Sequence, residues 1–423
     1  LTEQIGMRRK VKRGDAWFPL RIGKNFYNSL NQKSIEVFRT SDEEIDHNFE
    51  FGRPVMFFQV KNHPGENSSH ASFKSAASSS QGAMSSSQNT ISLSQGAASS
   101  SSASNPKSIK YFSFTGTVSY VDGDRMVINV PDSVSLLDLQ TEEPIGVQLS
   151  FDETSYKLMF EALDRTMKAK NNRLAYLRDL FYSHQKAGRF SFEPMKFPWL
   201  NPTQERAVNE VLWAKDVAIV HGPPGTGKTT TLVEAINETL MRESQVLVCA
   251  QSNMAVDWIS EKLVDRGINV LRIGNPTRVN DKMLGFTYER RFESHPDYPQ
   301  LWAIRKAIRE LRSNRKKGSE SFHQKMDRLR SRAAEIEIRI NAELFGEARV
   351  IACTLVGSAH RLLEGMKFGT LFIDEAAQAL EAACWIPMRR ASRVILAGDH
   401  CQLPPTVKSI AALRAGLGKT LMI

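Results

Sequence analysis

A glycine-rich octapeptide, Gly222-Pro-Pro-Gly-Thr-Gly-Lys-Thr229, constrains the fold of this chain more than any other feature. It directly follows a short apolar run at 216–221 that predicts a buried strand, and it precedes a segment with the 3.6-residue period of a helix. A second apolar run at 245–249 follows that helix. Strand, loop, helix and strand in this order predict a βαβ unit, and therefore a parallel sheet with a right-handed crossover.

The octapeptide fits the pattern GxxxxGK[ST], whose glycines let backbone N–H groups curl around phosphate oxygens. The helix that follows adds partial positive charge at its N-terminus. We expect Lys228 to reach the β- and γ-phosphates of ATP and the Thr229 hydroxyl to ligate Mg²⁺. The residues expected to contact the nucleotide here are Gly222, Pro223, Pro224, Gly225, Thr226, Gly227, Lys228, Thr229 and Thr230. The alternative, a glycine-rich turn that binds nothing, is disfavoured by the strand and helix on either side.

Further apolar runs at 349–353, 370–373 and 393–397 predict more strands of the same sheet. The middle run ends in two acids, Asp374 and Glu375. Alone, such a pair is usually a solvated turn. Next to a phosphate-binding loop, we expect Asp374 to hold the Mg²⁺ hydration shell and Glu375 to orient or deprotonate the attacking water.

The last of these strands leads into Gly398-Asp-His-Cys-Gln-Leu-Pro-Pro405. Gln402 carries a neutral amide that can sense the γ-phosphate or the attacking water, and the two prolines would stiffen the loop that holds it. Taken alone, the segment fits an ordinary proline-terminated loop equally well.

The first half of the chain has a different pattern. Runs rich in β-forming residues at 55–60, 110–121 and 125–130 predict strands, and Asp122-Gly123-Asp124 predicts a hairpin turn. Between the first two runs, a serine-rich segment at 67–105 cannot bury enough apolar surface to offset its ordering entropy. We interpret this segment as a disordered loop, with a prion-like or modified segment as the alternative.

These patterns predict an α/β protein with several parts. In chain order we expect a basic N-terminal segment at 1–50, a small β-barrel-like domain at 51–151, a helical stalk at 152–190, an α/β domain at 191–275 and 346–423, and a basic helical insertion at 276–345.

Charge points to a polyanionic partner. The chain has 56 Lys and Arg against 46 Asp and Glu, a net charge of +10. The excess is concentrated at 8–24, with seven basic residues against one acid, and at 301–345, with twelve against six. Nucleic acid and an anionic membrane surface both fit such charge, and so does a plain solvated face.

The remaining composition excludes other classes. No stretch approaches the ~20 apolar residues of a membrane span, and the first twenty residues are basic and polar rather than a signal peptide. The four cysteines, at 249, 353, 384 and 401, have no CxxC pair and no zinc-ligand spacing. We therefore expect reduced thiols in a cytoplasmic protein.

One ordered set of short motifs is specific to a known family. The chain presents, in this order, Gln204, Gly222–Thr229, Ser252-Asn253, Thr354, Asp374–Gln378 and Gly398–Pro405. This set resembles the superfamily 1 helicases, and most closely the Upf-like subgroup that contains the nonsense-mediated-decay helicase and immunoglobulin mu-binding protein 2. The segments at 249–257, 374–381, 384–387 and 396–400 are similar nearly word for word, and the resemblance extends over about 200–421.

The resemblance implies a RecA-like fold for the α/β domain and further site residues. Gln204 is similar to the adenine-reading residue of the family. A glutamine amide can pair with both N6 and N7 of adenine. Ser252 and Asn253 look like the first nucleic-acid motif, although Ser252 also suits a helix N-cap. Thr354 is similar to a further strand-contacting position.

The resemblance also implies a 5′-to-3′ motor on single-stranded DNA or RNA, with the β-domain and the basic insertion beside the strand. It implies a second RecA-like domain with arginine fingers, for which this sequence contains no motif, and a monomeric enzyme. Two other readings stay open: a nucleotide-regulated nucleic-acid-binding module without motor activity, and a membrane-associated ATPase, which would lack an amphipathic anchor.

Overall fold

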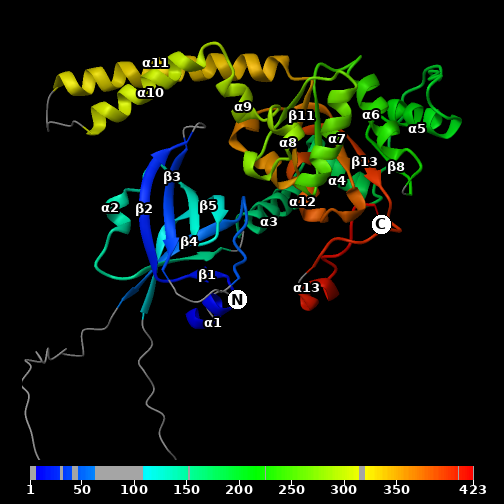
Figure 1. The fold of residues 1–423 in the computed structure, drawn as a ribbon. Coiled ribbons are helices and arrows are strands. Elements are labelled where there is room, and N and C mark those ends of the chain that lie inside the picture. The colour runs from blue at the N-terminus through cyan, green and yellow to red at the C-terminus, as the bar shows by residue number, and fades with distance from the viewer. Residues whose placement is uncertain are drawn as a thin grey trace, which may run out of the picture. The chain divides into compact units, whose positions relative to one another are not determined.

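The computed structural model describes residues 6–28, 32–40, 46–61, 108–150, 153–223, 225–313, 320–407 and 409–422. The serine-rich segment at 67–105 and Pro224 of the predicted nucleotide site lie outside these residues. The chain divides into two compact units. We call residues 1–26 and 33–150 the β unit, and residues 27–32 and 151–423 the α/β unit (Figure 1).

The β unit is built on a seven-stranded sheet with the order β1-β7-β4-β5-β6-β3-β2. Its elements are α1 (Met7–Lys12), β1 (Ala16–Trp17), β2 (Leu20–Tyr27), β3 (Lys33–Arg39), β4 (Pro54–Lys61), β5 (Ser108–Asp122), β6 (Arg125–Val130), α2 (Leu136–Leu139) and β7 (Ile145–Leu149). The hairpin predicted at 122–124 is confirmed: β5 and β6 pair antiparallel across it, and Gly123 takes a positive φ of 55°. Closure of the sheet into a barrel stays a prediction.

We had expected residues 1–50 to form a segment separate from the β domain. Instead, strands from this segment belong to the sheet. β1 pairs with β7, and β3 pairs with β6 from Lys33↔Val130 to Phe38↔Arg125. Our sequence reasoning predicted no strand at β3, in which Ile35 and Val37 are fully buried. These two side chains join Phe57 and Ile128 in the core of the unit. Buried alternate positions therefore decide the placement of this segment, whereas its charge does not.

The α/β unit contains a six-stranded parallel sheet with the order β10-β11-β9-β12-β13-β8, as the βαβ pattern predicts. Its strands are β8 (Val217–His221), β9 (Val246–Ala250), β10 (Val270–Arg272), β11 (Val350–Thr354), β12 (Phe368–Asp374) and β13 (Ala391–Gly398). The five neighbouring strand pairs are all parallel. Parallel order brings the carboxyl ends of all six strands to the same edge of the sheet.

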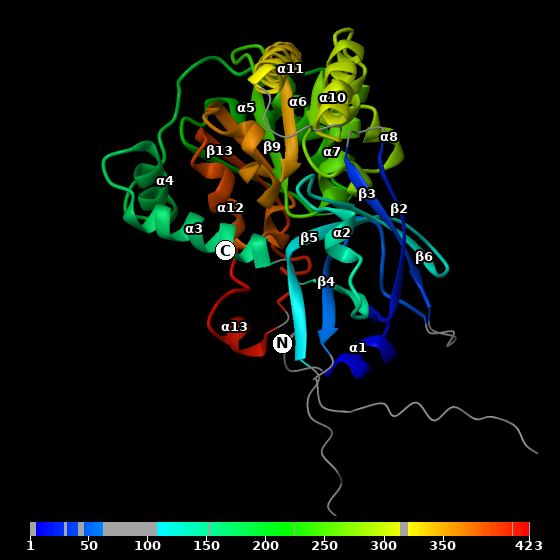
Figure 2. The same cartoon turned by 90° about the vertical axis from the view of Figure 1, so that its left-hand side faces the viewer.

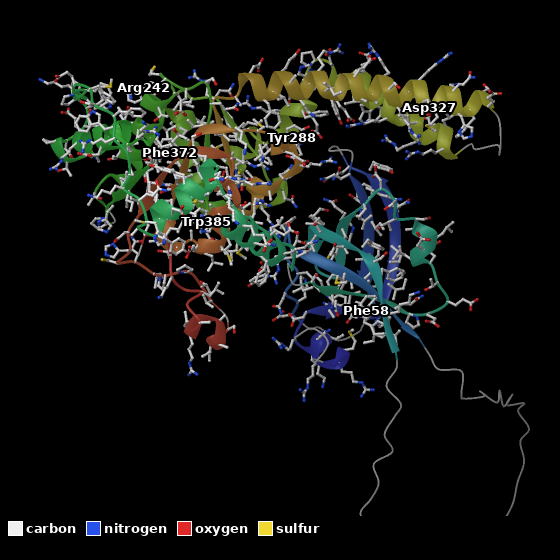
Figure 3. All side chains as sticks on the ribbon, turned by 180° about the vertical axis from the view of Figure 1, so that it is seen from behind. Phe58, Arg242, Tyr288, Asp327, Phe372 and Trp385 are labelled. Carbon is white, nitrogen blue, oxygen red and sulfur yellow. The ribbon has the colours of Figure 1, made fainter. Side chains whose placement is uncertain are left out.

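Helices cover both faces of this sheet (Figure 2). The helices that connect or flank the strands are α3 (Glu153–Lys168), α4 (Arg173–Phe181), α5 (Pro202–Trp213), α6 (Lys228–Thr239), α7 (Asn253–Asp265) and α12 (Glu381–Met388), with short 3₁₀ turns η2 (Val356–Ala359), η3 (Arg361–Leu363) and η4 (Ala376–Gln378). The last helix, α13 (Ile410–Arg414), buries none of its residues and lies away from the sheet. Two apolar cores result, one on each face. Trp385 of α12 belongs to the first and Phe372 of β12 to the second, and both are labelled in Figure 3.

A helical segment connects β10 to β11. It consists of η1 (Pro276–Arg278), α8 (Asp281–Leu284), α9 (Tyr288–Glu293), α10 (Tyr298–Ser313) and α11 (Glu320–Glu347). α10 and α11 pack along each other through a small apolar core that includes Leu301, Ile336 and Ile340. Most of the basic side chains of this helical pair stay outside that core. Across the described residues, no helix combines the length and apolar character needed to cross a membrane.

Candidate nucleotide-binding site

The strand ends of the α/β unit bring the predicted site residues to one edge. In the register of the sheet, Asp374 of β12 and Thr354 of β11 both lie beside Ala250 at the end of β9. Gly398 of β13 lies beside His221, the last residue of β8. The loops that carry Lys228, Ser252, Glu375 and Gln402 therefore all leave the sheet at its carboxyl edge, where ligands bind in open α/β sheets.

The glycine-rich loop turns sharply between β8 and α6. Gly225 and Gly227 adopt φ angles of 80° and 76°, in the left-handed region that favours glycine. Gly227 is the N-cap of α6 and supplies no side-chain cap. The first N–H groups of α6 are therefore left without a side-chain acceptor. Such groups at a helix N-terminus can donate hydrogen bonds to an anion. The loop fits a bound phosphate chain.

Gln204 lies against this loop although it is 23 residues away in sequence. Its Nε2 donates to the carbonyl of Gly227 over 3.4 Å, and its Oε1 accepts from the backbone N–H of Asn201 over 3.1 Å. A Cβ at position 227 would come within 2.1 Å of the Gln204 Nε2. The φ angle of 76° favours glycine at position 227, and any other residue would also displace the Gln204 amide.

Lys228 and Glu375 form an ion pair, with 3.4 Å between Nζ and Oε1. The lysine side chain is 11% exposed and the glutamate side chain 32% exposed, so both stay accessible to a ligand at the edge of the sheet. Glu375 takes φ 51° and ψ 40°, a left-handed conformation that costs a non-glycine residue about 1–3 kcal/mol. Such strain, at the point where the carboxylate meets the loop lysine, is typical of a functional position.

Asp374, the buried neighbour of Glu375 in sequence, lies at the end of β12. Its backbone neighbour Glu375 donates an N–H to Asp374 Oδ1 over 2.9 Å. Burial, and next the charge of Glu375, raise the pKa of the Asp374 carboxyl to about 6, although the Glu375 N–H bond and Lys228 act in the opposite direction. The carboxylates of Asp374 and Glu375 offer oxygen ligands, which a hard divalent cation such as Mg²⁺ prefers. The Lys228 ammonium balances part of their charge. Thr229, the second residue of α6, is half-buried beside Lys228.

Gln402 follows β13 and is held by Asp399. Its Nε2 donates to Asp399 Oδ2 over 3.2 Å, while Asp399 Oδ1 accepts the backbone N–H of Cys401 over 3.0 Å. The Cys401 N–H, together with Gln402 and His221, holds the pKa of Asp399 below its usual range, against a smaller opposing effect of burial. Asp399 therefore organises the loop that carries Gln402.

The three predicted nucleic-acid residues all take part in local structure. Ser252 caps α7 through the N–H of Ala255 over 3.1 Å, and Thr354 Oγ1 accepts the N–H of Gly357 over 2.9 Å. Asn253 Oδ1 accepts from Arg272 over 2.9 Å. The cap expected for Ser252 is present, and contact with a nucleic-acid strand stays a prediction for all three residues.

A buried ion pair between Arg272 and Asp257 escaped our sequence reasoning. The pair is 2.9 Å long, and its side chains are 0% and 3% exposed. Arg272 also donates to Asn253 and to the carbonyl of Ile273, while Asp257 Oδ2 accepts the N–H of Asn280. The pair thus fixes the orientation of Asn253. The available signal was a charged residue that ends an otherwise apolar strand, β10.

One cavity is lined by residues from three of the segments that leave the carboxyl edge of the sheet. It has a volume of about 320 Å³, and its lining includes Ser252 at the start of α7, Glu375 after β12 and Leu403 after β13. The predicted strand-contacting segment and the predicted hydrolytic carboxylate therefore face the same space.

The chain is similar to known proteins over this region. A family model described as an AAA domain matches residues 199–328 and 303–410, together half of the chain. The DNA polymerase alpha-associated DNA helicase A of Schizosaccharomyces pombe is 38% identical over 215 residues, covering 50% of this chain and 33% of the relative. The DNA-binding protein SMUBP-2 of Rattus norvegicus is 33% identical over 322 residues, covering 73% of this chain and 32% of the relative.

A third relative is the ATP-dependent helicase upf1 of Schizosaccharomyces pombe, which is 31% identical over 324 residues, covering 70% of this chain and 34% of the relative. The chain therefore spans about a third of the length of these relatives. The matched residues contain the glycine-rich loop, the paired carboxylates and the Gln402 loop described above. The chain belongs to the AAA domain family and, within it, to the Upf-like group of superfamily 1 helicases.

Proposed function

We propose that this chain is the ATP-binding part of a 5′-to-3′ helicase or translocase that acts on single-stranded DNA or RNA. The observation that carries the proposal is the meeting of Lys228 and Glu375, 3.4 Å apart, at the mouth of a glycine-rich loop. A phosphate-binding loop alone only holds a nucleotide. A carboxylate placed against the loop lysine adds the group that hydrolysis requires.

The roles of the residues follow from their positions. The free N–H groups at the start of α6 bind the phosphates, and Lys228 neutralises the β- and γ-phosphate oxygens. Gln204 reads the adenine. Thr229 and Asp374 would hold Mg²⁺, which neutralises phosphate charge when bound. Each of these roles uses a group that lies at the carboxyl edge of the sheet.

Hydrolysis then needs a positioned water. Glu375 accepts a proton from the water as its oxygen attacks the γ-phosphorus, and the bond to the β–γ bridging oxygen breaks to leave ADP and inorganic phosphate. Gln402, held by Asp399, senses the γ-phosphate or the attacking water. The Lys228 ammonium leaves Glu375 when it turns to the phosphates, which frees the carboxylate for this task.

Coupling to a nucleic-acid strand uses the shared cavity. Ser252 lines the same cavity as Glu375 and Leu403. A strand that contacts Ser252 therefore reaches the space beside the hydrolytic carboxylate, and its arrival can change the position of the hydrolytic groups. The basic residues of α10 and α11 supply salt-sensitive phosphate contacts. A second RecA-like domain would supply arginine fingers, worth ~10³–10⁵ in rate. In this proposal the protein acts as a monomer in the cytoplasm. The four free cysteines fit a reducing compartment.

The test measures ATP turnover by this chain with and without single-stranded DNA and RNA. We expect weak nucleotide binding and slow turnover, because the arginines of a second domain are needed for fast hydrolysis. Turnover near tens per second would contradict that dependence. Strand binding without any turnover would favour the nucleotide-regulated binding module instead, and binding to anionic liposomes in preference to single strands would favour the membrane-associated ATPase.

The Lys228→Ala variant tests the loop itself. We expect nucleotide affinity to fall by about 10–10²-fold, because a hydrogen bond to a charged group is typically worth about 1.5–3 kcal/mol. The exposed Lys170→Ala variant, on the loop after α3, is the matched control. Unchanged nucleotide affinity in Lys228→Ala would remove the basis of the assignment.

A further inference from the structure

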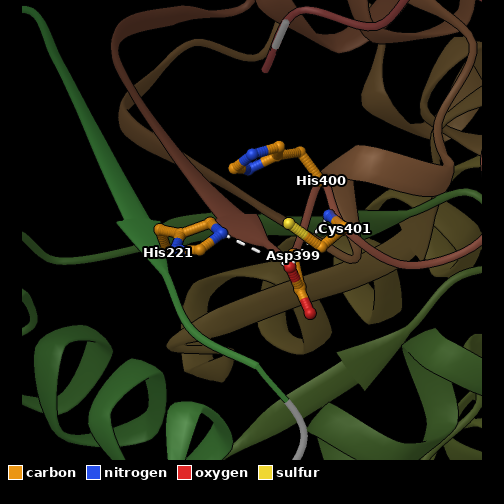
Figure 4. A group of neighbouring side chains, drawn as sticks. All are labelled: His221, Asp399, His400 and Cys401. Atoms are coloured by element: carbon orange, nitrogen blue, oxygen red, sulfur yellow. Dashed lines mark hydrogen bonds and ion pairs between the residues drawn. The ribbon is translucent and has the colours of Figure 1, made fainter.

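Four potential metal ligands gather beside the glycine-rich loop. They are His221 at the end of β8 and Asp399, His400 and Cys401 after β13 (Figure 4). Each offers one nitrogen, oxygen or sulfur atom, and these four atoms all lie within 4.8 Å of one another. Our reasoning from cysteine spacing indicated no zinc site, because these ligands come from two strands that are distant in sequence and adjacent in the sheet.

The cluster is held together by more than proximity. His221 Nε2 lies 3.3 Å from Asp399 Oδ1, and the Asp399 side chain is only 4% exposed. The rings of His221 and His400 have centroids 4.7 Å apart. The Cys401 N–H donates to Asp399, which places the cysteine on the same side as the two imidazoles. The buried carboxylate thus anchors a surface group of two imidazoles and a thiol.

We propose that His221, Asp399, His400 and Cys401 form a binding site for a borderline divalent cation of the Zn²⁺ class. Nitrogen and sulfur donors together select such cations, whereas Mg²⁺ prefers oxygen donors. Tetrahedral Zn²⁺ with bonds of ~2.0–2.3 Å holds its ligand atoms roughly 3.4 Å apart, so the side chains close by about 1 Å or slightly more. The Cys401 thiol releases its proton to solvent as the sulfur–metal bond forms.

The position of this site predicts its consequence. His221 immediately precedes Gly222 of the phosphate-binding loop, and Cys401 immediately precedes Gln402. A cation held by both segments ties the glycine-rich loop to the Gln402 loop and restrains both. Bound Zn²⁺ therefore slows ATP turnover; this consequence, unlike the binding itself, rests on the proposed function.

The first test titrates the intact chain with Co²⁺, a coloured substitute for Zn²⁺, in excess Mg²⁺ that saturates the carboxylates of the nucleotide site. We expect one Co²⁺ per chain, with a thiolate-to-cobalt charge-transfer band that Zn²⁺ abolishes. Cys401→Ser should remove the band, and Cys401→Ser or His400→Ala should weaken binding by at least the ~10–100-fold that loss of even an outer-shell partner causes. The exposed histidine after α4 gives the control His184→Asn, which should bind as the unaltered chain does.

The second test needs no variant, because the sequence has four cysteines and Cys401 is the exposed one. We expect Zn²⁺ to protect Cys401 from alkylation by iodoacetamide, as measured by mass spectrometry. Co²⁺ binding without the charge-transfer band, unchanged affinity in Cys401→Ser, or an alkylation rate that Zn²⁺ does not alter would each overturn the proposal.

ATP turnover separates the site from the proposed function. In the intact chain, the Zn²⁺ concentration that halves turnover should match that measured by Co²⁺ competition, and in Cys401→Ser it should rise by the same factor as the dissociation constant. A chain without ATPase activity would contradict the proposed function, while the cobalt and alkylation results would still decide whether the metal site exists.

Discussion

The two sheets of this protein place their residues in opposite ways. The six strands of the α/β unit run parallel, so their carboxyl ends, which carry the predicted site residues, all lie at one edge. The paired strands of the β unit alternate in direction and distribute their ends over two edges. Strand β9 is buried along its whole length, whereas β3 has buried and half-buried positions. Parallel order therefore brings the predicted site residues of the α/β unit to one edge, whereas the antiparallel order of the β unit does not.

The largest expected effect distinguishes the carboxyl edge of the α/β sheet from the β unit. We expect Glu375→Gln to lower ATP turnover by about 10²–10⁴-fold, because the amide cannot accept the proton of the attacking water. Nucleotide affinity should stay within a few-fold, since Lys228 and the loop remain. Steady-state turnover and equilibrium nucleotide binding measure the two quantities. The matched change Glu142→Gln, at an exposed position of the β unit, should alter neither. Equal losses in both variants would contradict the division.

The next effect concerns the buried pair behind Asn253. We expect Arg272→Met to lower the free energy of unfolding of the α/β unit by about 3–5 kcal/mol, because Asp257 is left buried without its cation. The double variant Arg272→Met with Asp257→Leu should recover part of this loss, since no uncompensated charge remains. Urea unfolding checks both variants. A double variant less stable than the single one would show that the N–H of Asn280, which Asp257 accepts, matters more than the charge.

A smaller effect depends on pH. Burial by itself raises the pKa of Asp216, but the N–H of Gly188 and the guanidinium of Arg173 outweigh it and hold the pKa below its usual range. A lowered folded-state pKa means that the stabilisation is fully present above the unfolded-state value of about 3.9 and is lost as the pH falls through the folded-state value. Asp216→Asn should therefore cost about 1–3 kcal/mol at neutral pH.

The measurement is urea unfolding of both chains at neutral pH and at a series of pH values below 4. The difference between them should shrink as the solution becomes more acidic. A difference that stays constant down to the lowest pH would mean that the charge of Asp216 contributes nothing and that shape alone distinguishes the two side chains.

The smallest effect tests whether the β unit unfolds independently of the α/β unit. Ile128 is fully buried in the β unit, and Ile128→Val should lower the stability of that unit by about 0.5–1.5 kcal/mol. Nucleotide affinity and the unfolding of the α/β unit should not change. The equivalent change Ile351→Val, at a fully buried position of β11, should have the reverse pattern. Unfolding followed by separate probes of the two units checks this pair, and equal responses of both units to either change would show that they unfold as one.

Local pattern was sufficient for much of the molecule. The glycine-rich loop, its strand and helix, the parallel sheet and the Asp122–Asp124 turn follow from residues close in sequence. Each depends on a short-range cause: a positive φ that glycine permits, or a 3.6-residue period. The same local signals placed Asp374 and Glu375 at a strand end.

What only the tertiary structure decided depends on which strands are neighbours. Strands β1, β2 and β3 join the β sheet in spite of the basic charge of this segment, because buried side chains such as Ile35 and Val37 pack into a core shared with β4 and β6. Arg272 meets Asp257, and His221 meets Asp399, through strand or helix pairings that a linear pattern does not contain. The sequence by itself determined the local geometry and chemical type of each group. Long-range pairing determined which groups meet, because burial is shared between segments far apart in the chain.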